Sequence, residues 1–144
     1  MTAQPPVLIA AALSAERAAL EATGIAQLLC PVFAPAELLA ELDITTQQPR
    51  NVGIAINEAG FVLSPTQVTL PRLLSAAYAL ALCAQGGAKR VLVAGFDGFS
   101  VDDHRFQEMD DVFAKFAKLA NAPQVVSITR TRFNIERSSM FAPL

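Results

Sequence analysis

Short apolar runs alternate with segments of helical periodicity along most of this chain. The apolar runs predict strands at residues 6–12, 25–33, 51–57, 61–63, 90–95 and 125–128. Start and stop signals around the periodic segments predict helices at about 15–23, 35–42, 70–85 and 103–120. Strands that alternate with helices are typical of a parallel sheet covered on both faces. We therefore expect an α/β fold, a three-layer Rossmann-like sandwich with a mainly parallel sheet.

Two of the expected helices have distinct patterns. The helix at 103–120 is amphipathic, because its apolar side chains recur at spacings of three and four residues: Phe106, Met109, Phe113, Phe116 and Ala120. Asp103 near its start favours the helix dipole. The helix at 70–85, with Thr69 as its expected N-cap, is apolar almost all round. We expect it to be buried on more than one side.

The composition favours one soluble domain. The chain has 144 residues, and 53% of them are apolar, which suffices for a substantial core. Its longest apolar run, 73–84, is shorter than the ~20 residues that cross a bilayer. The N-terminus lacks the basic and apolar segments of a secretion signal. We expect a single Rossmann-like domain over residues 1–144, cytoplasmic and without a membrane contact.

Charge and ligand content limit the cofactors and partners. Net charge is −2 and no basic face carries aromatic residues, so nucleic-acid binding is not expected. With one histidine and with Cys30 and Cys83 expected in the core, no metal site is expected. The six acids between 97 and 111 predict a solvated helix face in preference to a divalent-cation site. The first strand lacks a Gly-x-Gly turn, so no nucleotide cofactor is expected.

A candidate site follows the strand at 90–95. Asp97 stands between Gly95 and Gly98, at the strand end where open α/β sheets bind ligands. Its carboxylate can accept hydrogen bonds from a ligand, or it can bond its own backbone in a turn. The same rule places Asn57, at the end of the third strand, among the candidate neighbours.

The loop after the last strand carries basic and hydroxyl side chains: Thr129, Arg130, Thr131 and Arg132. Two arginines with interleaved hydroxyls can hold a phosphate or a carboxylate. They can also pair with the acidic run 97–111 and latch the tail across the sheet edge, which is the interpretation we favour. His104 can act as a base only with a positioned partner, and a surface role is the simpler expectation.

Two stretches carry a resemblance to a known family. They are Ala94-Gly95-Phe96-Asp97-Gly98-Phe99 and the C-terminal segment 126–141. Over roughly residues 70–142 the chain resembles the C-terminal domain that follows the catalytic barrel in bacterial HMG-CoA-lyase-like (4-hydroxy-2-oxovalerate aldolase-like) proteins. A looser likeness links the same strand end to Rossmann-like sialyltransferases.

The chain departs from the aldolase family in two ways. Arg130 stands where the family tends to have proline, and Phe133 replaces a tyrosine. The barrel is absent too, since such a barrel takes ~250 residues. The resemblance implies a domain excised from a longer aldolase-type chain, with the lyase chemistry on the missing part.

Three functions follow as expectations. The first is a non-catalytic accessory domain of an aldolase-type protein that binds a small anionic or sugar-like ligand, with an aldolase barrel or a second copy as partner. The expected ligand-binding residues are Asn57, Gly95, Asp97, Gly98, His104, Thr129, Arg130, Thr131 and Arg132. The alternatives are a small nucleotide-sugar-dependent transferase with His104 as base, and a structural or oligomerisation module.

Overall fold

The computed structural model describes residues 7–8, 32–41 and 49–142. The strands are β1 (Val7–Leu8), β2 (Val32–Ala34), β3 (Pro49–Asn51), β4 (Gly53–Ile56), β5 (Val62–Leu63), β6 (Gln67–Leu70), β7 (Arg90–Val93), β8 (Gln124–Ser127) and β9 (Glu136–Arg137). The helices are α2 (Ala36–Glu41), α3 (Ser75–Gln85) and α4 (His104–Phe116). The helix expected at 15–23 and most of the strands expected at 6–12 and 25–33 lie outside the described residues. No helix within the described ranges has the length and hydrophobicity to span a membrane.

The described strands form three small sheets. β1, β2 and β3 pair in parallel, and so do β7, β8 and β9. The sheet between them in sequence has the order β4-β6-β5, with β4 parallel and β5 antiparallel to β6. The α/β class is therefore confirmed. The strands do not form one continuous sheet, and one of the three sheets is mixed.

The start of α3 differs from the expectation. We expected Thr69 to cap this helix, but Thr69 lies in β6, and α3 follows Leu74 without a side-chain cap. Within β6, Gln67 is exposed while Val68 and Leu70 are fully buried. The backbone of β6 pairs with β4 on one side and β5 on the other. This pairing with a strand on each side outweighs the local capping signal.

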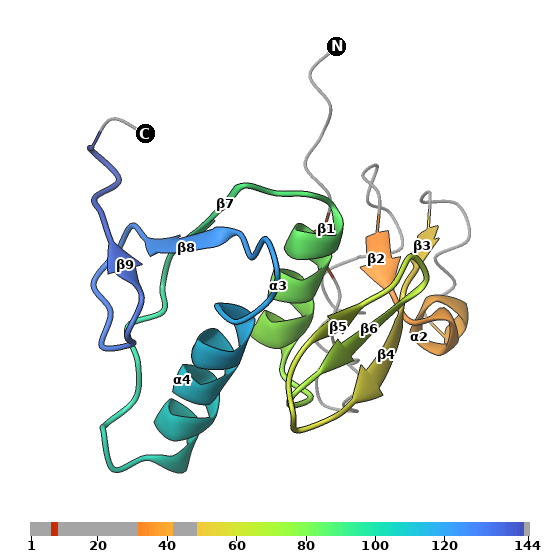
Figure 1. Ribbon diagram of the computed structural model, residues 1–144, viewed down its shortest axis with the longest axis horizontal. Coiled ribbons are helices and arrows are strands. Elements are labelled where there is room, and N and C mark those ends of the chain that lie inside the picture. Colours follow the sequence, from red (N-terminus) through yellow and green to blue (C-terminus); the bar gives the residue numbers. More distant parts are fainter. Residues whose placement is uncertain (1–6, 9–31, 42–48, 143–144) are drawn as a thin grey trace.

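The core lies around α3. This helix is placed between the β4-β6-β5 sheet and the β7-β8-β9 sheet, and α4 lies beside it (Figure 1). Residues of α3 are buried on more than one side, as expected: Ala77, Tyr78, Leu80, Ala81 and Leu82. The amphipathic stripe of α4 is confirmed by the burial of Met109, Phe113 and Phe116, to which the structure adds Val112. The helix ends at Phe116 and not at residue 120 as expected, so Ala120 lies beyond it and is exposed. The Phe61 and Phe116 rings pack in a T-shaped arrangement with centroids 5.3 Å apart.

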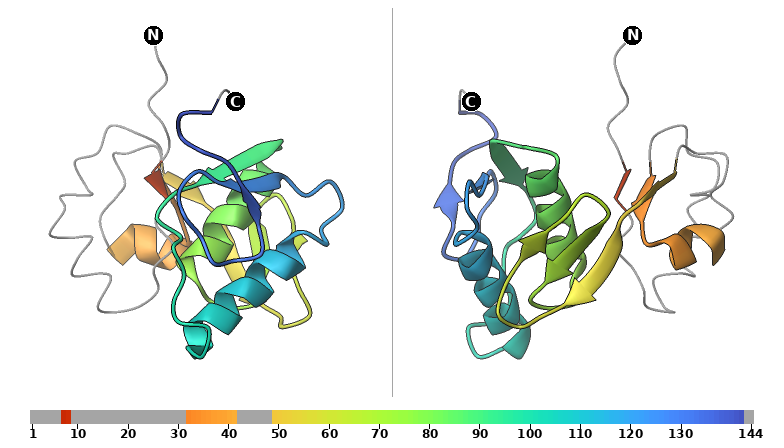
Figure 2. Two further views of the ribbon diagram at one scale, coloured as in Figure 1. Left: turned by 90° about the vertical axis from the view of Figure 1, so that its left-hand side faces the viewer. Right: turned by 45° about the vertical axis from the view of Figure 1, so that its right-hand side comes forward.

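The segment after β8 contains a strand that the sequence patterns did not predict. It runs back to form β9, which lies beside β8 in parallel (Figure 2). The pairing sets Ser127 opposite Arg137, and the Ser138 N–H donates to the Ser127 carbonyl at 2.8 Å. A strand of two residues has no periodicity to read, so only the pairing reveals it.

Candidate functional site

The loops that follow β7 and β8 lie side by side. β7 and β8 are parallel neighbours, so the loops that follow the two strands leave the sheet at the same edge. The Gly95 N–H donates to Oγ1 of Thr129 at 3.0 Å, and the Arg132 N–H donates to the Asp97 carbonyl at 3.1 Å. These two bonds bring the Asp97 segment next to the arginine-containing loop.

Gly98 permits the close contact between these loops. Its φ of 91° lies in the left-handed region, which side chains rarely adopt. A Cβ atom at this position would lie 3.2 Å from Cβ of Arg132 and 3.6 Å from the Phe106 ring. A glycine is therefore required here both by the backbone conformation and by the approach of Arg132.

Inner hydrogen bonds fix the loop after β8. The buried Ser127 hydroxyl donates to the Thr129 carbonyl at 2.9 Å. Oγ1 of Thr131, also buried, accepts from the Phe133 N–H at 3.2 Å. Because these groups face inward, the exposed side chains of Arg130 and Arg132 are left on the solvent side.

An open, polar hollow lies between the two loops. It has a volume of about 750 Å³. Its lining residues are Asp97, Ile128, Thr129, Arg130, Thr131, Arg132, Arg137, Ser138 and Ser139. Three arginines against one aspartate give this polar hollow a formal charge of +2 (3 − 1). Such a lining can hold an anion with the guanidinium groups and offer hydroxyl and carboxylate partners to neighbouring polar atoms.

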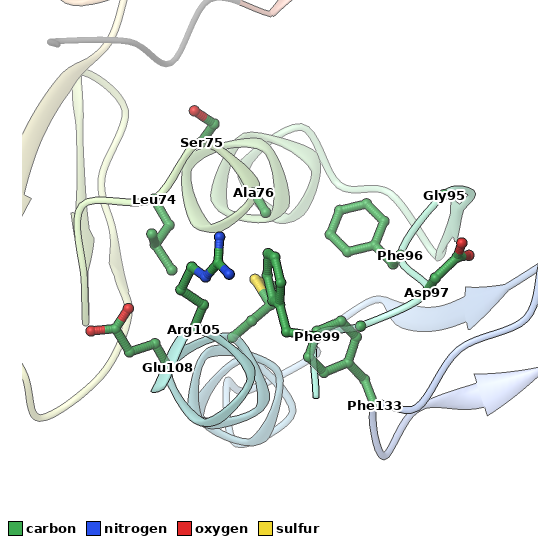
Figure 3. Close-up of a pocket in the computed structure, with 12 residues that line it drawn as sticks. Leu74, Ser75, Ala76, Gly95, Phe96, Asp97, Phe99, Arg105, Glu108 and Phe133 are labelled. Atoms are coloured by element: carbon green, nitrogen blue, oxygen red, sulfur yellow. The ribbon is translucent and has the colours of Figure 1, made fainter. Parts of the chain in front are cut away.

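A second hollow, the apolar cavity, lies on the other side of the same loop. It has a volume of about 460 Å³ and opens between the start of α3, the loop after β7 and α4 (Figure 3). Phe96 and Phe99 are among its walls, whereas the Asp97 carboxylate at its edge is directed away from it. Asp97 lines both hollows.

The rim of the apolar cavity carries a fixed arginine. Asp103 caps α4 by accepting from the Arg105 N–H at 2.9 Å, and its Oδ2 accepts from the Arg105 guanidinium at 2.6 Å. These bonds lower the pKa of Asp103 to about 2, the side-chain bond having the larger effect. The same guanidinium stacks 4.1 Å above the Phe99 ring. Phe99, which is partly exposed, is thereby held at the cavity mouth.

The structure brings most of the expected site residues together. Asp97 and the four residues 129–132 line the polar hollow, with Gly95 and Gly98 in the adjoining loop. Asn57 lies elsewhere, in a turn where its Oδ1 accepts from the Ala59 N–H at 3.0 Å. The side chain of His104 is 81% exposed, lies 3.7 Å from Asp103 and lines neither hollow.

The favoured latch between the arginines and the acidic run is wrong in its chemistry. Among the residues that the structure describes, no ion pair joins Arg130, Arg132 or Arg137 to the acids 97–111. The tail is held there by neutral donors instead. The Asn134 N–H donates to the Asp110 carboxylate at 3.2 Å, in addition to the bond between Arg132 and Asp97.

Several lining residues were not expected from the sequence. Arg137, Ser138 and Ser139 enter the polar hollow because β9 returns the chain to β8. The sequence signal that includes Arg137 is the net charge of +2 over residues 129–144. The acidic run does not assemble a metal site: across the described ranges, no group of three His, Cys, Asp or Glu side chains is placed to hold an ion.

No family model, curated protein or solved structure matches the chain. The resemblance of residues 70–142 to the aldolase-associated domain therefore stays a prediction.

Proposed function

We propose that this protein is a ligand-binding domain that holds a small organic anion, such as a phosphate monoester or a carboxylate, in the polar hollow. The observation that carries the proposal is the gathering of Arg130, Arg132 and Arg137 with Asp97 around one open space. These residues come from three separate parts of the fold, the loops after β7 and β8 and the strand β9.

Each group has a distinct part in the proposed recognition. The guanidinium groups bind the anion through charge-assisted hydrogen bonds, which are about twice as strong as neutral ones. Ser138 and Ser139 supply hydroxyl groups at the same hollow. Asp97 accepts hydrogen bonds from hydroxyl groups of the ligand and disfavours a second anionic group beside it. The preferred ligand is thus a hydroxylated monoanion or phosphate ester.

Isothermal titration calorimetry with inorganic phosphate and ribose 5-phosphate tests this proposal. Arg132→Gln should weaken the binding of both by roughly 10- to 100-fold, since a hydrogen bond to a charged group is worth about 1.5–3 kcal/mol. Arg50→Gln is the matched control, because Arg50 is an exposed arginine on β3 outside the hollow. Wild-type protein that releases no heat with either anion at millimolar concentration would reject the proposal.

Asp97→Ala separates the binding of the anion from the recognition of the ligand's hydroxyl groups. This variant should bind inorganic phosphate at least as tightly as the wild type, because a negative charge is removed. It should lose the preference for ribose 5-phosphate, because the hydroxyl acceptor is gone. Unchanged preference in Asp97→Ala would remove Asp97 from the site.

The Rossmann-like arrangement and the association with an aldolase-type protein are further proposals, which began from the sequence. The parallel pairing of β7 with β8, and a hollow lined by the loops that follow both strands, support a Rossmann-like arrangement of this half of the chain. We further propose that the domain acts in the cytoplasm as the accessory part of an aldolase-type protein. Binding to a separately expressed aldolase barrel, measured by calorimetry, tests that association.

A further inference from the structure

The apolar cavity has the size and lining of a site for an organic group. Its volume of about 460 Å³ lies within the ~300–1,000 Å³ typical of small-molecule pockets. The walls are made by apolar side chains from four parts of the chain: Leu74, Ala76, Phe96, Phe99, Met109 and Phe133. Met109 and Phe133 are buried, and they form a floor on which an apolar group is removed from water.

Two of the three charged side chains that line the cavity have partners within the protein, and the third, the Asp97 carboxylate, is directed away from it. Arg105 is bonded to both carboxylate oxygens of Asp103. Glu108 lies 3.7 Å from the Arg72 guanidinium. Since these charges are paired within the protein, the cavity favours an uncharged occupant over an ionic one.

The apolar cavity and the polar hollow meet at Gly95 and Asp97. Asp97 lines both, and Gly95 lines the cavity while its N–H bonds to Thr129 of the hollow. A Cβ atom at Gly95 would meet nothing within 4 Å, so the rim is open at this point. A Cβ atom at Gly98 would instead meet Cβ of Arg132 at 3.2 Å and the Phe106 ring at 3.6 Å, so the loop has no comparable opening there.

We infer that the ligand is an amphiphilic anion, with its charged head in the polar hollow and an uncharged alkyl, acyl or aryl group that passes over Gly95 into the apolar cavity. This inference rests on the proposed function and adds the ligand's second half. Burial of each methylene group strengthens binding, so affinity rises with the length of the apolar group until the cavity is filled.

Calorimetry with a series of phosphate monoesters tests the inference on the unmodified protein. Methyl, n-butyl and n-hexyl phosphate are compared with inorganic phosphate. We expect hexyl phosphate to bind at least tenfold more tightly than methyl phosphate, and hexyltrimethylammonium, with the opposite head charge, to bind at least tenfold more weakly than hexyl phosphate. Phosphate binding with no gain from chain length would overturn this inference and leave the proposed function intact. Failure of every anion would overturn both.

Methyl NMR locates the apolar group. The chain has three methionines, of which Met109 lines the cavity and is 7% exposed, while Met140 is 60% exposed. In protein labelled at the methionine methyl carbons and assigned with Met109→Leu, hexyl phosphate should shift the Met109 resonance and inorganic phosphate should not. A Met109 resonance that does not shift at saturation with hexyl phosphate would show that the hexyl group binds elsewhere and would overturn the inference.

Ala76→Phe fills the cavity from α3 and provides a second check. It should abolish the gain from the hexyl group while leaving inorganic phosphate binding within about twofold of the wild type. Ala120→Phe, at an exposed position outside both hollows, is the control and should keep the gain. Retention of the full gain by a folded Ala76→Phe protein would contradict the assignment of the cavity.

Discussion

The backbone N–H of Arg132 donates to the carbonyl oxygen of Asp97 at 3.1 Å. This bond links two loops that are separated along the chain by the whole of α4 and β8. It uses backbone atoms only. Both side chains line the polar hollow, and Nη1 of Arg132 also donates to the Phe99 carbonyl at 3.5 Å. The bond therefore positions a carboxylate and a guanidinium in one site without neutralising either of them.

Gly98→Ala should destabilise the fold by about 1–3 kcal/mol, because alanine is strained in the left-handed backbone conformation of this residue. The added methyl group would also crowd a contact that is already tight. The added methyl group would lie 3.2 Å from Cβ of Arg132, which is not a flexible side-chain end. Urea unfolding measures the change. Gly87→Ala is the matched control, because Gly87 has a φ of 75° and a Cβ atom added there would meet nothing within 4 Å. Equal losses in the two variants would show that the Arg132 contact adds nothing.

Tyr78→Phe should cost about 1–3 kcal/mol, the penalty for leaving a buried carbonyl without its donor. The Tyr78 hydroxyl donates to the Val52 carbonyl at 2.7 Å, and the side chain is 1% exposed. The bond joins α3 to the segment between β3 and β4. Chemical unfolding followed by circular dichroism gives the difference, and a Phe variant as stable as the wild type would contradict it.

The same tyrosine predicts a pH dependence at the alkaline end. Burial raises the pKa of Tyr78 to about 12 from an ordinary value of 10.0. Because the folded state holds the phenolic proton more tightly than the unfolded state, this contribution to stability is complete below pH 10.0 and is lost as pH rises toward about 12. Tyr78 is the only tyrosine in the chain, so near-ultraviolet tyrosinate absorbance reports it alone. Titration at the ordinary value in protein that is still folded would contradict the burial.

Asp103 predicts that folding stability falls at acid pH. The pKa of Asp103 is about 2, against an ordinary value of 3.8. Its contribution to folding stability is therefore present above pH 3.8 and is lost as pH falls toward about 2. Arg105→Gln should return this pKa toward its ordinary value, since the Arg105 side chain is the main cause of the shift. Carboxyl carbon NMR measures the titration. An unchanged pKa in Arg105→Gln would assign the shift to the backbone bond of the helix cap instead.

Two Asp103 variants separate capping from charge. Asn is as good an N-cap as Asp, so Asp103→Asn should keep the start of α4 and release only the Arg105 guanidinium. Asp103→Ala should lose both functions and be the less stable of the two. Hydrogen exchange at the Arg105 amide distinguishes them, and equal protection in both variants would show that the cap does not hold the helix start.

Local patterns were sufficient for the start and the buried face of α4, for β7 and for the loop at Asp97, but they placed the end of α4 at residue 120 instead of Phe116. The 3-and-4 spacing of its apolar residues marks the buried face of α4, and Asp103 supplies the cap where the sequence offers an aspartate. Asp97 could be singled out because Gly95 and Gly98 follow an apolar run, a signal confined to a few neighbouring residues. Such signals are readable because they depend on helix and strand periods and on backbone freedom alone.

The sequence by itself determined the α/β class, the buried character of α3 and the residue types that a site near Asp97 would use. Only the tertiary structure decided that β6 is a strand, that β9 returns to β8, and that Arg137 joins Arg130 and Arg132 while Asn57 and His104 do not. The physical reason is that strand pairing and hollow formation depend on partners distant in the chain. The residues next to a position in the sequence do not predict which segment will pack against it in the fold.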